Sequence, residues 1–320
     1  MNVRLGSTIF AVCRLIIGAA MNHGDSRAAI KITSIAELLS EVLLFAKAGV
    51  GDVWFRGQVN SDWRLSPHAY RVEHTFHEQE CVSSFRLNAP ARHEPTPEWE
   101  DWAGWLSLMQ HYGLPTRLLD WTRSPLNAAF FACFDIHGKV SGSDAAIWAL
   151  TPRYVNALTF NTPQILPLSN DNAQIRDFML GAFENDNVPP SAYLGICAVT
   201  PQHRNTRMLV QQSVFTLHKN IIPLDKVPDF ADTHVKFVIP SEKKQSLLEE
   251  LELIGISASS LYPDLTYLST DIISAAQRSV FHRYKVDETT LGMKAYWDMK
   301  RRIESAPTFL AKKGPAAPGA

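Results

Sequence analysis

Cysteine is scarce in this chain of 320 residues, which contains only four of them. Cys13, Cys81, Cys133 and Cys197 lie far apart, and none belongs to a CxxC pair of the kind found in metal and redox sites. The eleven histidines are scattered and form no HExxH segment. These absences argue against a disulfide-stapled fold and against a metal centre. They predict reduced thiols, mostly in the core of a cytoplasmic protein.

Glycine-rich phosphate-binding loops are missing as well. Neither GxGxxG nor GxxxxGK(S/T) occurs, which excludes the usual sequence signatures of dinucleotide-binding folds and P-loop proteins. GxSxG is also absent, so nothing supports a serine hydrolase. A nucleotide site in this chain would have to be built from other residues.

The chain also lacks an excess of charge and a long hydrophobic run. The 31 Lys and Arg residues nearly balance the 32 Asp and Glu residues, which demands no polyanionic partner but is compatible with a local basic groove. The apolar segment at residues 7–21 is interrupted by Arg14 and is too short to cross a bilayer, so we expect no membrane partner. It is an extension upstream of Met21, a small packing segment or a signal peptide.

Short apolar strands separated by helices at uneven spacing predict an α+β fold, with a central mixed or antiparallel sheet flanked by helices. The sequence is 46% hydrophobic, which permits a full core. Strands are expected at residues 53–57, 62–65, 116–120, 145–150, 193–199, 211–218 and 235–239. Helices are expected at residues 34–48, 76–87, 98–112, 124–134, 173–183, 202–208 and 242–254, and within 263–282.

Residues 53–58, VWFRGQ, place an arginine inside an apolar strand. Alternation along the strand puts Trp54 and Arg56 on one face. Gly57 would let a ligand or another backbone approach closely. A guanidinium in this setting is suited to hold a phosphate or diphosphate. The alternative is a structural ion pair with Asp120, or with Asp52 or Asp62, which are nearby in sequence.

Residues 110–134, QHYGLPTRLLDWTRSPLNAAFFACF, gather polar side chains around one turn and one helix start. The Ser-Pro pair at 124–125 predicts a helix N-cap followed by proline at the first helical position. Free N–H groups at such an end can bind an anion. The polar side chains either satisfy one another or line a site for an anionic, aromatic ligand. They are His111, Tyr112, Thr116, Arg117, Asp120, Trp121, Thr122 and Ser124.

Several candidate residues, within this set and beyond it, have two interpretations each. Trp121 either stacks on a planar base or belongs to the core. His111 is either a general base or a residue that completes a helix C-terminus. Gln211 and Gln212 open a predicted strand, where an amide can orient a ribose hydroxyl but cannot take a proton; the alternative is an exposed strand entry.

Four segments together resemble the bacterial FRG domain: FRGQ, QHYGLPTRLLDWTRSPLNAAFFAC, RMLVQQSVFTLH and GISASSLYPDL. The resemblance covers roughly residues 34–279. It implies an N-terminal extension at 1–30, an FRG domain at 31–285, a C-terminal helix at 286–305 and a disordered tail at 306–320.

The chain is also more loosely similar to ADP-ribosyltransferases of the arginine–serine–glutamate type, which implies a split sheet and NAD as co-substrate. By this similarity Arg56 would hold the diphosphate, and Thr122 and Ser124 would occupy the second motif. The third motif departs from the family, because it offers glutamine and no glutamate. The implied NAD-binding set is Arg56, Gly57, Gln58, Tyr112, Thr116, Arg117, Trp121, Thr122 and Ser124. The implied catalytic set is Asp120, His111, Gln211 and Gln212.

The expected function is that of an NAD-dependent ADP-ribosyltransferase-like toxin or anti-phage effector. Its acceptor would be a macromolecule, either a protein or a single-stranded nucleic acid, and an antitoxin is a further expected partner. The alternative is a non-catalytic module that binds or senses a nucleotide or nucleic acid in a defence system. A third interpretation treats the polar cluster as a buried network that fixes the core.

Overall fold

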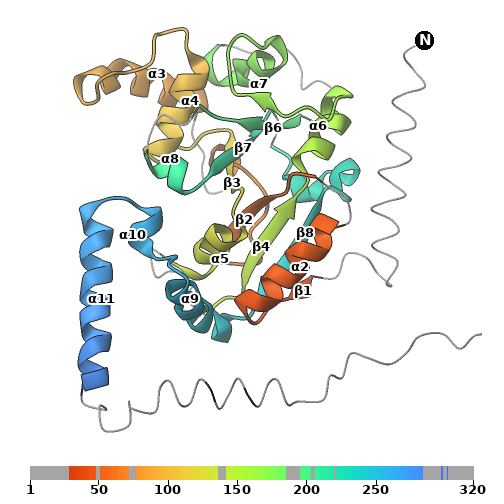
Figure 1. Cartoon of the computed structure of the whole chain (residues 1–320). Coiled ribbons are helices and arrows are strands. Elements are labelled where there is room, and N and C mark those ends of the chain that lie inside the picture. Colours follow the sequence, from red (N-terminus) through yellow and green to blue (C-terminus); the bar gives the residue numbers. More distant parts are fainter. Residues whose placement is uncertain are drawn as a thin grey trace, which may run out of the picture. The chain divides into compact units, whose positions relative to one another are not determined.

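The computed structural model describes residues 29–47, 51–71, 77–135, 142–184, 195–202, 206–219 and 221–283, together with Trp297 and Arg301. The described chain divides into one unit that ends at Pro263 and a second that begins at Asp264 (Figure 1). The predictions for residues 1–28, for Cys13 and for the tail at 306–320 lie outside the described residues. The same holds for most of the predicted helix at 286–305.

Eight strands of the first unit form one mixed sheet, in the order β1-β8-β4-β2-β3-β7-β6-β5. The central strands pair antiparallel, and the pairs β1–β8 and β5–β6 are parallel. This architecture confirms the predicted α+β class. The strands are β1 (Ile30–Lys31), β2 (Trp54–Gln58), β3 (Leu118–Thr122), β4 (Ala145–Leu150), β5 (Leu166–Pro167), β6 (Ile196–Thr200), β7 (Ser213–His218) and β8 (His234–Ile239).

The helices of the first unit gather in two groups (Figure 1). Helices α3, α4 and α7 pack together near β3, β6 and β7, and α2, α5 and α9 pack together near β2, β4 and β8. These helices are α2 (Ile35–Lys47), α3 (Glu78–Asn88), α4 (Trp102–His111), α5 (Pro125–Cys133), α7 (Ala173–Phe183) and α9 (Lys244–Leu253). The others are α6 (Pro152–Phe160), α8 (Thr206–Val210) and α10 (Ala258–Leu261), with short 3-10 turns such as η1 (His68–Tyr70). The second unit contains α11 (Leu265–Arg283).

Helix starts follow the local signals that predicted them. The Ser34 hydroxyl accepts a hydrogen bond from the Glu37 amide at 3.2 Å, and α2 begins at the next residue. The Ser124 hydroxyl accepts from the Asn127 amide at 3.2 Å, and Pro125 is the first residue of α5. Both caps satisfy a backbone donor that the helix leaves open.

The sheet opens along the seam between β2 and β3. Strand β2 pairs with β4 at five positions and β3 pairs with β7 at five, but β2 and β3 pair only at Phe55 and Thr122. Next to that pair, the contact between the two strands is made by a side chain: the Arg56 Nη1 donates to the Asp120 carbonyl at 2.7 Å. This seam lies between β2 and β3 of the single eight-stranded sheet.

One predicted strand is absent, and another begins two residues later than predicted. Residues 62–65 form turn and coil, because β4 and β3 occupy the two sides of β2 and leave no place for a hairpin partner. Gln211 and Gln212 lie in a turn before β7, where Gln212 has a positive φ of 50°. Their backbone N–H groups donate to the carbonyls of Arg207 and Leu209 in α8. Both residues therefore belong to the turn that follows α8, and β7 begins after them.

The core occupies both faces of the sheet. Alternation along β7 sends Phe215 and Leu217 into the cluster beneath α4 and α7, and Val214 into the cluster with Trp54 and Trp121. A buried polar chain runs through the second face. The Trp121 Nε1 donates to the Thr216 hydroxyl at 3.0 Å, and that hydroxyl lies 2.9 Å from the His218 Nε2.

Gly57 is the point where α5 crosses β2. A Cβ atom at Gly57 would lie 2.0 Å from the Ala128 carbonyl oxygen and 2.5 Å from the Ala132 nitrogen. Of the two expected roles for Gly57, the structure therefore shows the close approach of another backbone. The small residues of α5 permit that approach.

We predict that Gly57→Ala lowers the free energy of unfolding by about 3 kcal/mol or more, because helix backbone cannot yield as a flexible side chain can. Urea denaturation measures the change. Gly142→Ala is the matched control, since a Cβ atom there meets nothing within 4 Å, and it should stay within about 1 kcal/mol of the wild type. Equal stability of the two variants would contradict the close approach.

A second prediction concerns His218, which is fully buried. Burial, with a smaller contribution from Arg56, lowers the pKa of His218 to about 3. Between about pH 6.5 and 3 the unfolded chain therefore takes up a proton that the folded chain cannot, so His218 makes the protein less stable as the pH falls. The expected slope is about 1.4 kcal/mol per pH unit.

Urea denaturation at several pH values between 7 and 4 tests this slope. The variant His218→Asn should lose stability less steeply with acid than the wild type does. A surface histidine, changed in His77→Asn, is the control and should keep the wild-type slope. Parallel curves for wild type and His218→Asn would contradict the prediction.

Candidate functional site

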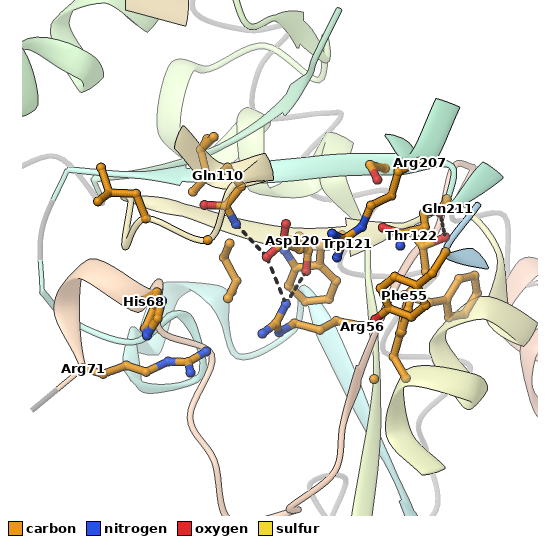
Figure 2. A pocket seen from close by; sticks show the side chains of 18 residues that line it. Phe55, Arg56, His68, Arg71, Gln110, Asp120, Trp121, Thr122, Arg207 and Gln211 are labelled. Carbon is orange, nitrogen blue, oxygen red and sulfur yellow. Dashed lines mark hydrogen bonds and ion pairs between the residues drawn. The ribbon is translucent and has the colours of Figure 1, made fainter. Parts of the chain in front are cut away.

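A cavity of about 340 Å³ lies at the seam where β2 and β3 diverge (Figure 2). This volume lies within the range of small-molecule sites, roughly 300–1,000 Å³. Its lining comes from both strands and from segments that surround the seam. The residues are Phe55, Arg56, Gly57, His68, Arg71, Gln110, Gly113, Leu114, Leu118, Leu119, Asp120, Trp121, Thr122, Phe131, Arg207, Gln211, Ser213 and Tyr262.

Arg56 is the central cation of this cavity. Its side chain is 14% exposed, and its Nη1 lies 3.9 Å from the Asp120 Oδ2, a looser contact than the bond to the Asp120 carbonyl. Its Nε is buried and has no hydrogen-bond partner within the described chain. Burial lowers the pKa of Arg56 to about 10, with Asp120 opposing the shift and Arg71 adding to it. The guanidinium therefore stays charged at neutral pH and keeps a donor that the described chain does not use.

Asp120 is held in place by a chain of side chains from α4 and the following turn. Its Oδ2 accepts a hydrogen bond from the Gln110 Nε2 at 2.8 Å, and the Gln110 Oε1 accepts from the Thr116 hydroxyl. The Asp120 side chain is nevertheless 56% exposed. It is thus a positioned carboxylate that faces the cavity and can be reached from it.

The hydroxyl of Thr122 is already engaged by the backbone. It donates to the Gln211 carbonyl at 2.7 Å and accepts from the Ser124 amide at 3.1 Å. The Gln211 side chain donates in turn to the Leu261 carbonyl at 3.0 Å. Thr122 and Gln211 therefore line the cavity and also fasten its wall, while Ser124 caps α5 outside the lining.

Trp121 contributes to the lining, but its indole is anchored in the core. The side chain is buried, and its Nε1 is bonded to Thr216. This placement corresponds to the core interpretation of Trp121. Among the lining residues, Phe131 and Tyr262 instead carry aromatic rings on side chains that are partly exposed.

Arg117 points away from the cavity into a buried ion pair. Its Nε and Nη2 bind the two carboxylate oxygens of Glu78 at 3.1 and 2.6 Å, and its Nη1 donates to the Phe178 carbonyl at 2.7 Å. All three nitrogens are thereby used to join β3 to α3 and α7. Arg117 has a structural place in this fold.

Other sequence candidates also lie outside the lining. Gln58 is buried and accepts from the Trp148 indole at 2.8 Å. Tyr112 is exposed, with its hydroxyl 3.1 Å from the His93 Nδ1. Thr116 is buried beside Gln110, and Gln212 sits in the exposed turn before β7.

His111 lies beside the cavity and not in its lining. Its ring packs against Tyr112 at 4.9 Å between ring centroids. Burial, followed by the charges of Arg207 and His93, lowers the pKa of His111. The imidazole is therefore neutral at physiological pH, near the cation Arg207.

Several lining residues escaped the sequence analysis, above all His68, Arg71, Gln110, Arg207 and Tyr262. Three of them stand in quoted segments: Gln110 opens QHYGLP, Arg207 opens RMLVQQ and Tyr262 stands in GISASSLYPDL. The family resemblance of these segments therefore pointed to the three residues, although the residue types alone did not indicate a role in binding. His68 and Arg71 follow β2 in a stretch without any motif.

Two general features of the described residues bear on the class of site. No group of three or more His, Cys, Asp or Glu side chains within them is arranged to hold a metal ion. None of their helices combines the length and the apolar character needed to cross a membrane. Of their cysteines, Cys133 and Cys197 are buried, and burial raises the pKa of both thiols.

Comparison with known proteins supports one family. Residues 51–139 match the model of the FRG domain. The searches of curated proteins and of solved structures gave no significant match. The comparisons give no support to the looser similarity to ADP-ribosyltransferases, and the longer extent of the domain stays a prediction.

The matched segment coincides with most of the cavity. It contains Arg56, Asp120, Gln110, Arg71 and their neighbours, and only Arg207, Gln211, Ser213 and Tyr262 of the lining residues lie beyond it. The Phe-Arg-Gly triplet supplies three adjacent lining residues in β2. Residues 51–139 of this chain thus match the FRG domain family and provide the greater part of the cavity at the β2–β3 seam.

Proposed function

We propose that the cavity binds NAD as co-substrate and that the chain transfers ADP-ribose to a macromolecular acceptor. One observation carries the proposal: the Arg56 guanidinium, whose side chain is 14% exposed, lies beside the positioned carboxylate of Asp120 in a cavity of ligand size. Arg117, in contrast, directs its Nε, Nη1 and Nη2 to partners within the protein.

Charge in the lining favours a diphosphate. Arg56, Arg71 and Arg207 contribute three positive charges and Asp120 one negative charge, which leaves a formal balance of 3 − 1 = +2 when His68 is left out of the count. The Coulombic effect of Arg71 on Arg56 indicates that the two cations lie close together. A diphosphate with two negative charges would relieve their repulsion and accept charge-assisted hydrogen bonds.

The carboxylate of Asp120 is suited to the transfer step. The bond between nicotinamide and the ribose C1′ breaks, its electron pair leaves with nicotinamide, and positive charge develops on the ribose. A carboxylate beside that centre stabilises the charge. It then accepts the proton of the acceptor hydroxyl or amine that bonds to C1′. Asp120 is the single acidic residue among the described residues of the lining, so it takes the role that a late-strand glutamate would have.

A protein or a single-stranded nucleic acid would serve as acceptor, in a toxin or anti-phage effector restrained by an antitoxin.

A second function, a nucleotide-sensing module without turnover, is favoured by one specific observation. Gln211 stands near the expected glutamate position, and its amide is bonded to the Leu261 carbonyl. Release of nicotinamide from NAD separates the two functions, because a sensor would bind NAD without consuming it.

We predict that Arg56→Gln weakens NAD binding by about 10-fold or more, because a charge-assisted interaction with phosphate is lost. Isothermal titration calorimetry measures the affinity, and Arg56→Lys should recover part of it. Arg153→Gln is the control, since Arg153 forms a surface pair with Asp52 outside the cavity. If wild type and Arg56→Gln bind NAD equally well, the diphosphate assignment fails.

We predict that Asp120→Asn slows nicotinamide release by about 100-fold or more while NAD still binds, because the amide cannot accept a proton or offset positive charge. Chromatography of the products from NAD with a candidate acceptor measures the rate. Asp177→Asn is the matched control, because Asp177 is similarly exposed and pairs with Lys219 away from the cavity. Full activity of Asp120→Asn would refute the catalytic assignment, and wild type that binds NAD without turnover would favour the sensor.

A further inference from the structure

The segment at residues 255–265, GISASSLYPDL, has no role in the chemistry proposed above, yet its residue Tyr262 lines the cavity. Ser257 and Ser260 form a capping box at the start of α10, in which the Ser257 amide donates to the Ser260 hydroxyl at 3.0 Å. Within α10, Ala258 and Leu261 are buried. This short helix is thereby fixed to the body of the first unit, and Tyr262 follows it directly into the lining.

Tyr262 is held by side chains from two other parts of the chain. Its ring meets the ring of Phe131 in α5 edge to face, with 6.2 Å between centroids. The Arg207 guanidinium in α8 lies 4.8 Å from the centre of the Tyr262 ring. Gln211 fastens the same segment by its bond to the Leu261 carbonyl. Phe131, Arg207 and Tyr262 are all partly exposed, so they form a surface of the cavity and not a sealed core.

The cavity is therefore different at its two ends. Figure 2 shows His68 and Arg71 on one side of Arg56, and Phe55, Thr122 and Arg207 on the other. The first end offers cations and hydrogen-bond donors. The second end adds the aromatic surfaces of Phe131 and Tyr262 to a cation, a combination that binds flat rings by stacking and cation–π contact.

We propose that Phe131, Arg207 and Tyr262 form the subsite for the aromatic ring of a nucleotide, while Arg56 and Arg71 hold its phosphates. The inference rests on the proposed function, since it assigns an orientation to a ligand of the same cavity. The ring assigned to this subsite is adenine, the ring that NAD and ADP-ribose share. Tyr262 thus becomes a residue that selects ring-bearing ligands over bare diphosphate.

The test compares ligands with and without a ring. Isothermal titration calorimetry measures the binding of NAD, ADP-ribose and inorganic pyrophosphate to wild type and to Tyr262→Leu. Because a stacking surface is lost, Tyr262→Leu should bind NAD and ADP-ribose with an affinity about 10-fold or more below that of wild type. Its affinity for pyrophosphate should stay within about twofold of the wild-type value. Tyr262→Phe keeps the ring and should retain the wild-type affinities. Tyr267→Leu, in the second unit, is the matched control and should bind as wild type does.

The outcomes separate the two proposals. If wild type binds neither NAD nor ADP-ribose, the proposed function fails and the subsite falls with it. If wild type binds both and Tyr262→Leu binds them equally well, the subsite fails and the proposed function stands. An equal loss for pyrophosphate would also overturn the subsite, because Tyr262 would then act only by holding Arg207. Should Tyr262→Leu not fold, Phe131→Leu provides the same comparison from α5.

Discussion

The structure depends on the way Arg56 replaces backbone pairing at the centre of the sheet. Strands β2 and β3 share one paired position, and the next contact across the seam is the bond from the Arg56 Nη1 to the Asp120 carbonyl. The cavity lies at this seam, and the guanidinium that bridges it also keeps one nitrogen that the described chain does not use.

Each residue of the Phe-Arg-Gly triplet has a different task at this seam. Phe55 makes the one backbone pair with Thr122, Arg56 bridges to Asp120, and Gly57 admits the backbone of α5. A side chain at Gly57 would push α5 away, and α5 carries Phe131, which lines the cavity. The triplet therefore couples the stability of the sheet to the shape of the site, because three successive residues face three different partners.

Much of the fold follows from local signals. Serine caps and proline at the first helical position located α2 and α5, and the apolar run AAIWAL located β4. The failures came where tertiary contacts outweigh local preference. Residues 62–65 had the composition of a strand but no free edge to pair with, and Gln211 and Gln212 were taken up by the end of α8. Of the candidate site, Arg56, Asp120, Thr122 and Gln211 do meet in one cavity, whereas Arg117 and Gln58 are used by the core.

By itself the sequence determined the α+β class, most helix starts and the family resemblance, because each rests on residues close together or on one specific pattern. The tertiary structure decided that Arg56 contacts Asp120. Only the tertiary structure decided which polar side chains are hydrogen-bonded within the protein and which remain for a ligand. Arg117 and Arg56 look alike in sequence, but Glu78 and the Phe178 carbonyl satisfy the first, and the second keeps a donor beside a cavity. The wall of Phe131, Arg207 and Tyr262 likewise joins three distant segments, and no local pattern encodes such a contact.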